Sequence, residues 1–271
     1  MHIHRVAIHS VPRSGSSWFG ALMDAHPEII YKYQPLFSYA FKGFLSESSE
    51  EKDIIDFFNS ISITKDDFLD QLESKNKGLV TEFLKTEPKA IVYKEVRYHH
   101  ILKNMLERDK EVRVIGLIRN PLAVIYSWWT APKEFKRELG WNFENEWLEA
   151  PSKNLNRKEE FNGYQKWKEV AILFNNLKVM FPDRFLLVKY SDLLHETEHV
   201  VNSVMKFIGL NIDIQQLDFI KASKGRHTTD AYGVFKKKPD DFEWVGRLPD
   251  SMVEYIKNDL DKTKLKEYLD Q

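Results

Sequence analysis

The chain has 271 residues, enough to bury a large hydrophobic core, and we expect one elaborated domain over residues 1–271. Its 40 lysines and arginines nearly balance its 41 aspartates and glutamates, and the net charge of −1 argues against a global attraction to nucleic acids or anionic membranes. The absence of cysteine excludes disulfides, thiolate metal sites and cysteine nucleophiles, and it favours a cytoplasmic location.

The first residues lack the apolar run of a signal peptide, and no later segment approaches the ~20 apolar residues of a membrane-spanning helix. We therefore expect no membrane span. His2 and His4 would share one face of a strand, but an exposed chain start explains them better than a metal site, and we expect no bound metal.

Apolar runs of strand length alternate with helical patterns along the chain. Residues 6–9 form a first strand, which enters a turn rich in small residues. A helix follows, with Ser16 or Ser17 as its N-cap, until His26 and Pro27 end the pattern. Further elements are expected in this order: a strand at 90–93, a helix around 102–106, a strand at 112–118, a helix at 121–129, a long helix from about 160 and a strand at 185–190.

This alternation is typical of βαβ units. It predicts an α/β fold, a three-layer sandwich with a central, mostly parallel sheet, whose ligands bind at the carboxyl ends of the strands. Two segments fit the plan poorly: 43–78 is charged and helical, and 130–162 is rich in Trp, Asn and charge. We interpret both as lids or insertions beside the ligand site.

The turn after the first strand has the chemistry of an anion-binding loop. A tight loop followed at once by a helix N-terminus points its backbone N–H groups at a phosphate. Arg13 adds a permanent positive charge, Gly15 permits close approach, and the hydroxyl donors are Ser14, Ser16 and Ser17. The Walker pattern is absent, because Ser16 takes the place of its lysine, and this disfavours an ordinary nucleotide triphosphatase. Taken alone, the loop also suits an ordinary strand-to-helix turn.

A second polar cluster follows the strand at 112–118. Arg119 can fork onto phosphate oxygens, and Ser127, two turns into the next helix, can add a hydroxyl from the same side. Taken singly, Arg119 suits a surface ion pair and Ser127 a solvent-facing position equally well.

The two clusters together resemble a known family. The string Pro12-Arg13-Ser14-Gly15-Ser16-Ser17-Trp18 resembles the 5′-phosphosulfate loop of the sulfotransferases that use 3′-phosphoadenosine 5′-phosphosulfate (PAPS). Arg119, Asn120-Pro121 and Ser127 resemble the family's site for the 3′-phosphate. The resemblance covers about 6–35, 91–127 and 185–209, and it implies a P-loop-like strand–loop–helix, PAPS as co-substrate and adenosine 3′,5′-bisphosphate (PAP) as product.

Two weaker matches concern the rest of the nucleotide. Residues 189–194 resemble the family's strand that ends in Y-x-D-L, which places Tyr190 by the adenine and Trp18 as its stacking partner on another side. By base rate both are more often core aromatics. Lys224, Gly225 and Arg226 resemble the basic loop that closes over the 3′-phosphate, although a solvated basic turn is the alternative.

Sulfuryl transfer needs positive charge on the leaving phosphate and a general base for the acceptor. The resemblance assigns the first role to Arg13. The family's small-molecule branch has K-T-H where this chain has Lys94-Glu95-Val96, and another branch has an acidic residue near Gln34. These departures leave the base unassigned by resemblance.

We predict that Glu95 is the base and that Lys94 is a second charge on the sulfuryl group. A structural partnership of Glu95 with Arg97 or Lys94 is the alternative, and His99 and His100 are the fallback bases.

The predicted function is therefore sulfuryl transfer from PAPS to a hydroxyl or amine of an acceptor. A carbohydrate is the preferred acceptor class, because tryptophans suit stacking on sugar rings, although they equally suit packing within a lid: Trp129, Trp141 and Trp147. Two alternatives stay open, an atypical P-loop kinase and a nucleotide-binding module without catalysis.

Overall fold

The computed structural model describes residues 3–225 and 241–269. Its sheet has five parallel strands in the order β2-β3-β1-β4-β5. The strands are β1 (His4–His9), β2 (Ile29–Tyr33), β3 (Ala90–Glu95), β4 (Arg113–Ile118) and β5 (Phe185–Lys189). In the register of the central pair, His9 at the end of β1 lies opposite Glu95 at the end of β3. All five carboxyl ends therefore meet at one edge of the sheet.

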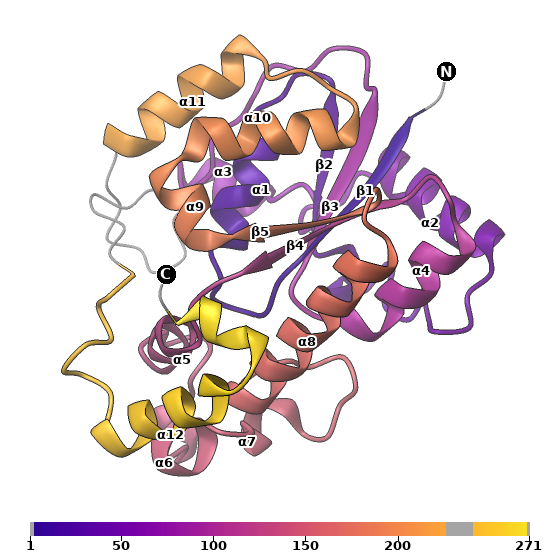
Figure 1. Ribbon diagram of the computed structural model, residues 1–271. Coiled ribbons are helices and arrows are strands. Elements are labelled where there is room, and N and C mark those ends of the chain that lie inside the picture. The colour runs from indigo at the N-terminus through magenta and orange to yellow at the C-terminus, as the bar shows by residue number, and fades with distance from the viewer. Residues whose placement is uncertain (1–2, 226–240, 270–271) are drawn as a thin grey trace.

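Helices cover both faces of this sheet (Figure 1). One face carries α1 (Ser16–Asp24), α9 (Tyr190–His195), α10 (Thr197–Ile208) and α11 (Ile214–Gly225). The other carries α2 (Glu51–Ile63), α4 (Leu102–Arg108), α5 (Pro121–Trp129), α8 (Tyr164–Met180) and α12 (Asp250–Asp261). The shorter elements are α3 (Leu72–Asn76), α6 (Phe143–Glu146), α7 (Pro151–Asn154) and the 3₁₀ turns Pro35–Phe37, His99–Ile101, Arg137–Leu139 and Lys264–Tyr268.

Side-chain alternation along the central strands builds two separate cores. In β1, Val6 and Ile8 pack under α1 and α10, whereas Ala7 packs on the opposite side with α2 and α8. Successive strand side chains point to opposite faces, so a strand buried on both sides needs a continuous apolar run rather than an alternating one. This confirms the predicted α/β three-layer fold with its parallel sheet.

Strand β2 was not predicted from the sequence. Its sequence IIYKY contains Lys32, a residue that weakens an apolar pattern. The side chain of Lys32 is nevertheless buried, and its ammonium contacts a carboxylate oxygen of Asp70 at 2.6 Å. The pairing partner comes from a distant segment, so the local pattern gave no sign that the lysine could be buried.

Two predicted details differ from the structure. The expected caps Ser16 and Ser17 lie inside the first turn of α1, and Gly15 occupies the N-cap with no side-chain hydrogen bond. Tyr190, expected at the end of the last strand, begins α9 instead. Within residues 3–225 and 241–269, no helix combines the length and the apolar character that crossing a bilayer demands.

Candidate functional site

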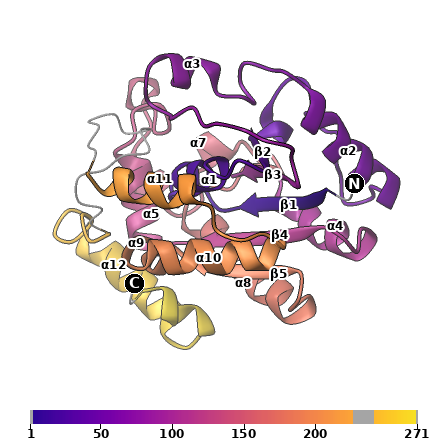
Figure 2. The ribbon, with the colours of Figure 1, turned by 90° about the horizontal axis from the view of Figure 1, so that it is seen from above.

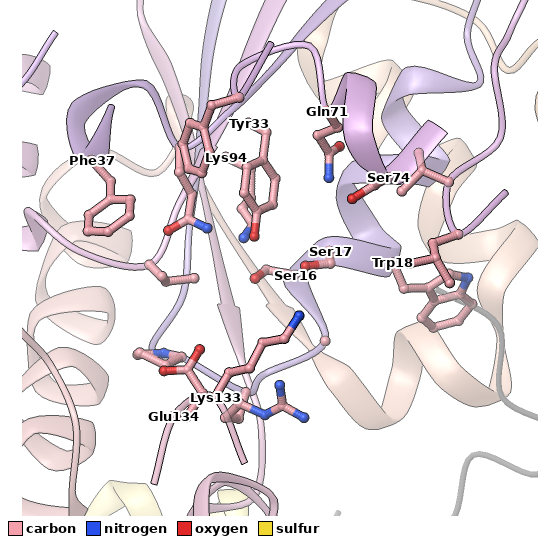
Figure 3. Close-up of a pocket in the computed structure, with 18 of the residues that line it drawn as sticks. Ser16, Ser17, Trp18, Tyr33, Phe37, Gln71, Ser74, Lys94, Lys133 and Glu134 are labelled. Atoms are coloured by element: carbon pink, nitrogen blue, oxygen red, sulfur yellow. The ribbon is translucent and has the colours of Figure 1, made fainter. Parts of the chain in front are cut away.

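A cleft of about 1220 Å³ opens at the carboxyl ends of the strands. Its floor is the loop after β1, and its walls include residues from β3, α5, α9, α10 and α11. Seen from above, α1 and α11 lie side by side near one end of the sheet and α3 lies at its outer margin (Figure 2). Figure 3 shows the interior of the cleft, where Ser16 lies between Tyr33 and Lys133.

The loop after β1 has the conformation that an anion cradle requires. Arg13 and Gly15 both adopt left-handed backbone angles, with φ of 69° and 83°. A Cβ atom on Gly15 would lie 2.2 Å from a ring carbon of Tyr190, so only glycine fits between the loop and α9. Four of the predicted phosphate-binding residues line the cleft: Arg13, Gly15, Ser16 and Ser17. The hydroxyl of Ser14 is fully buried away from the cleft, so Ser14 can contribute its backbone N–H but not its side chain.

The structure brings the two predicted phosphate clusters together. The Arg13 Nε donates to the hydroxyl of Ser127 at 3.2 Å, and the Arg119 Nη1 donates to the backbone carbonyl of Arg13 at 2.7 Å. Arg119 and Ser127 both line the same cleft as the loop. Residues that are distant in sequence thus form one continuous basic floor.

Arg119 is held firmly in place. Its Nε contacts a carboxylate oxygen of Asp241 at 2.5 Å, and its guanidinium lies 4.8 Å from the ring centre of Tyr190. The backbone carbonyl of Arg119 accepts a hydrogen bond of 2.9 Å from the indole of Trp167. The side chain is only 11% exposed, so these contacts hold the guanidinium in one position at the wall of the cleft.

The predicted aromatic partners of the adenine lie next to each other. Trp18 and Tyr190 both line the cleft, and their rings meet edge to face with centroids 6.5 Å apart. Thr197 and Ser223 line the cleft as well. A ring system and its amino group would find both apolar and polar contacts there.

The predicted basic loop at 224–226 is only partly described. Lys224 and Gly225 end α11, so this part is helical and not a loop. Gly225 suggested a loop at this point, but α11 continues as far as this residue. Nothing is described of the side chain of Lys224, and Arg226 lies outside the described residues.

The predicted catalytic pair in β3 divides between the two faces of the sheet. Lys94 lines the cleft, and its ammonium lies 4.3 Å from the centre of the Tyr33 ring. Burial lowers the pKa of Lys94, although the neighbouring Glu95 carboxylate acts in the opposite direction. Glu95 is fully buried and is not among the residues that line the cleft. Because adjacent strand residues point to opposite faces, only one of the pair can reach a substrate.

Burial also raises the pKa of Glu95, in part offset by the charge of Lys94 and by a hydrogen bond from the Val96 backbone N–H at 3.1 Å. Its second carboxyl oxygen has no hydrogen-bond partner among the described residues. The structure therefore gives no access route for an acceptor to the predicted base. The alternative role of Glu95 as a structural partner is supported only by its charge interaction with Lys94, because Arg97 pairs with Glu160 instead.

Neither fallback base reaches the cleft. His99 is completely buried, and its Nδ1 lies 3.0 Å from the Nδ1 of His9 beneath the sheet. His100 is half-buried and is absent from the cleft lining. Both belong to the layer of helices on the α4 side, because β3 leads directly into the turn His99–Ile101 on that face.

Several residues that line the cleft were not predicted from the sequence. The aromatic side chains of Tyr33, Phe37 and Phe68 cluster at the end of the cleft away from Trp18, with Tyr33 and Phe68 ring centres 5.4 Å apart. The segment at 130–162 contributes charged residues instead of tryptophans: Lys133, Glu134 and Lys153. The signal in the sequence was a Lys133-Glu134 pair a few residues after a helix, a pattern that any solvated turn would also show.

The tryptophans expected to stack on a sugar lie elsewhere. Trp129 stacks on Phe143 with centroids 4.3 Å apart, and Trp147 meets Tyr255 edge to face. Trp129, Trp141 and Trp147 all pack against the hydrophobic core and not into the cleft. They pack within the segment that carries Glu134 and do not line the cleft.

In the described part of the chain, no three His, Asp or Glu side chains gather where they could ligate one metal ion. His4 instead shares a hydrogen bond of 3.2 Å with Arg113, and His2 lies outside the described residues.

Comparisons with known proteins agree with this architecture. The chain resembles the mouse sulfotransferase SULT7A1 complexed with PAP at a TM-score of 0.56, with 12% identity over 98% of this chain and 88% of that one. It resembles retinol dehydratase in a complex with retinol and PAP at 0.53, with 15% identity over 98% and 83% of the two chains. The sulfotransferase domain from the curacin biosynthetic pathway scores 0.51, with 15% identity over 97% and 99%.

A search of the curated proteins finds no match. Because these solved structures share only 12–15% sequence identity with this chain, their similarity shows only that the fold is shared. The family model described as sulfotransferase domain, in contrast, matches residues 4–267, which is nearly the whole chain. The chain therefore belongs to the sulfotransferase family.

Proposed function

We propose that this sulfotransferase takes its sulfuryl group from PAPS and transfers it to a hydroxyl of a small-molecule acceptor. The observation that carries the proposal is the single basic floor formed by the loop after β1, Arg119 and Ser127. Two of the similar structures hold PAP, the product that PAPS leaves behind, which supports this choice of donor.

Each group in this floor has a separate task. The N–H groups of the loop and the guanidinium of Arg13 face the 5′-phosphate, where negative charge grows as the bridging bond to sulfur breaks. Arg119 and Ser127 bind the 3′-phosphate and fix the nucleotide's position. Lys94, at the end of β3, contacts the sulfuryl oxygens from the other side of the cleft. No step in this scheme calls for a metal ion.

The acceptor binds at the end of the cleft lined by Tyr33, Phe37 and Phe68. Phe37 is 46% exposed and Phe68 39% exposed, so these rings offer apolar surface to a ligand. The segment 43–78 supplies Phe68 to this end, and 130–162 supplies Lys133 and Glu134 on the facing side of the cleft. Both segments then act as acceptor-side insertions of one domain. An acceptor with an aromatic or aliphatic ring beside its hydroxyl suits this wall better than a strongly hydrated carbohydrate does.

The donor is tested by thermal shift. PAP raises the unfolding midpoint by mass action if it is the true ligand, whereas ATP with magnesium leaves it unchanged. The reverse result supports an atypical kinase and contradicts the proposal. Stabilisation by PAP without turnover of PAPS, over a broad acceptor panel, supports a nucleotide-binding module without catalysis.

Acceptor class and turnover are tested together with radiolabelled PAPS. Phenols, cyclic alcohols, aliphatic amines and mono- and disaccharides are offered in parallel at equal concentration. Preferential labelling of the phenols and cyclic alcohols is expected, and labelling confined to the saccharides overturns the assignment of the apolar wall.

Arg119→Lys should weaken PAP binding roughly tenfold, because a lysine keeps the positive charge but loses the two-pronged contact with phosphate. The free energy of unfolding should change little, since the ammonium can still pair with Asp241. Titration calorimetry with PAP and urea unfolding measure the two quantities.

Arg113→Lys is the matched control. Arg113 begins the same strand, at the end of the sheet away from the cleft, and its Nη1 contacts His4. PAP affinity should stay at its original value in this variant. Equal losses of affinity in the two variants would show that the effect comes from strand β4 as a whole and not from a phosphate contact.

A further inference from the structure

The cleft contains a carboxylate that no step above uses. Among the described residues that line it, the carboxylates are Asp67, Glu73 and Glu134. Asp67 is exposed, and Glu73 lies on α3 with a side chain that is 82% exposed and paired with Lys77. Glu134 alone of the three lies beside the phosphate-binding loop, and its side chain is 27% exposed.

Glu134 lies across the cleft from the groups that hold the acceptor. Figure 3 shows Glu134 and Lys133 on one side of Ser16, with Tyr33 and Lys94 on the other. The charges of Arg13 and Arg97 act on the pKa of its carboxylate, and that carboxylate acts in turn on the pKa of Lys94 and of Tyr33. A group with that set of neighbours is near the point where acceptor and leaving group must meet.

The carboxylate is ionised at neutral pH. Burial by itself raises the pKa of Glu134, but the ion pair with Lys153, and then the charges of Arg13 and Arg97, outweigh this effect and lower it. The Lys153 ammonium lies 3.1 Å from the Glu134 Oε2, so one carboxyl oxygen has a fixed cation as its partner. The other oxygen, Oε1, has no hydrogen bond to Lys153 in the structure and can accept one from a ligand.

We propose that Glu134 is the general base of the reaction and that Lys153 orients it. The proposal rests on the proposed sulfuryl transfer and assigns the one role that the rest of the site leaves open. Glu95 and His99 are buried on the far side of the sheet, so neither can touch an acceptor in this cleft.

The step balances without a further reactant. The acceptor oxygen forms a bond to sulfur as the bond between sulfur and the bridging phosphate oxygen breaks. The electron pair of the broken bond stays on the 5′-phosphate, next to Arg13. The acceptor's hydroxyl proton passes to Glu134 as the new bond forms, so the product is a sulfate monoester anion and Glu134 is left as a neutral carboxylic acid.

Glu134→Gln should lower kcat by about 10²- to 10⁴-fold, the usual contribution of a positioned base. PAP affinity should stay within about threefold of the original, because the nucleotide is held by the loop and Arg119. Glu134→Asp should retain part of the rate, since it keeps the carboxylate and shortens the side chain.

Lys153→Met tests the orienting role. Removing the ammonium removes the largest influence that lowers the pKa of Glu134, so the acidic limb of the kcat profile should move to higher pH. This variant keeps the remaining charged neighbours, Arg13, Arg97 and Lys94. Their positive charges limit how far the pKa of Glu134, and with it the acidic limb of the kcat profile, can rise. A merely structural role for Lys153 would lower activity at every pH without moving the limb.

Glu138→Gln is the matched control. Glu138 lies in the same segment, is exposed, pairs with Lys136 and is absent from the cleft lining. Its kcat should equal that of the unmodified protein. The proposal is overturned if Glu134→Gln keeps its original kcat, or if Glu134→Gln and Glu138→Gln lose activity equally. Absence of PAP binding in the unmodified protein would instead overturn the proposed function itself.

Discussion

At the scale of single residues, position 15 shows how one missing side chain makes a binding site. Gly15 adopts a φ of 83°, which an L-residue with a Cβ rarely takes. A Cβ atom at this position would lie 2.2 Å from a carbon of the Tyr190 ring, so the loop and α9 pack closely here. The same contact places Tyr190 beneath the Arg119 guanidinium. One glycine therefore aligns the loop, the aromatic ring and the distant arginine.

Gly15→Ala should lower the free energy of unfolding by about 2–4 kcal/mol, from ~1–2 kcal/mol of backbone strain and a similar cost of moving the Tyr190 ring. PAP affinity should fall more than tenfold, because the loop N–H groups are displaced. Urea unfolding and calorimetry measure the two effects.

Gly43→Ala separates strain from crowding. Gly43 has a φ of 74°, but a Cβ there would meet nothing within 4 Å. This variant should lose only the ~1–2 kcal/mol of backbone strain and should bind PAP normally. Equal changes in unfolding free energy and in PAP affinity for Gly15→Ala and Gly43→Ala would show that the contact with Tyr190 contributes to neither.

At the scale of elements, helix α5 connects the two ends of the 3′-phosphate cluster. Asn120 caps its N-terminus by accepting a hydrogen bond of 2.9 Å from the Leu122 N–H. The amide of Asn120 also donates to the carbonyl of Leu269 at 2.9 Å. The residue before this cap is Arg119, and Ser127 lies two turns further along the helix. The cap thus fixes the spacing between the two predicted phosphate ligands.

Asn120→Ala should destabilise the protein by about 1–2 kcal/mol, because it removes a buried cap and leaves the Leu122 N–H without its acceptor. The exposed cap Asn142 on α6, which accepts from the Glu144 N–H, provides the comparison. Asn142→Ala should cost less, about 0.5 kcal/mol. Chemical unfolding of both variants measures the two losses of stability. A larger loss of stability in Asn142→Ala than in Asn120→Ala would show that burial does not determine the cost of removing a helix cap in this protein.

At the scale of the whole molecule, a buried polar cluster lies under the sheet on the side away from the cleft. His9 and His99 are both fully buried, with their Nδ1 atoms 3.0 Å apart, and the His9 Nε2 lies 3.2 Å from the hydroxyl of Tyr93. Burial lowers the pKa of His9 to about 3, and burial together with the charge of His9 lowers that of His99 further below its usual range. Both rings are therefore neutral in the folded protein.

These lowered pKa values make the fold sensitive to acid. The unfolded chain binds protons at these histidines below about pH 6.5, while the folded protein does not. Their contribution to stability is therefore complete above pH 6.5 and is lost as the pH falls toward the folded value, at up to ~1.4 kcal/mol per pH unit for each ring. Urea unfolding between pH 7 and pH 5 measures this slope.

Replacing one ring should flatten the slope. His99→Gln removes one of the two protons taken up on unfolding, whereas His199→Gln, at an exposed position on α10, should leave the slope as it is. A slope that is unchanged in His99→Gln would assign the acid sensitivity to other groups.

The sequence by itself determined the nucleotide half of this protein. Strand, small-residue loop and helix follow one another directly at 4–24, so each could be predicted from its own local pattern. Arg119 and Ser127 also stand on consecutive elements. Local chemistry was enough there, because the residues that act together are near in sequence or lie at the ends of neighbouring parallel strands.

Only the tertiary structure decided which side of β3 faces the cleft and what the insertions contribute. Whether Lys94 or Glu95 faces the cleft depends on which face of the sheet α1 covers. The residues around β3 do not indicate this. Tryptophans at 129, 141 and 147 packed into the core, while Glu134 and Lys153 met across a gap in sequence to form an ion pair at the cleft. Long-range packing sets these positions, and a pattern read along one segment carries no information about the segment it will touch.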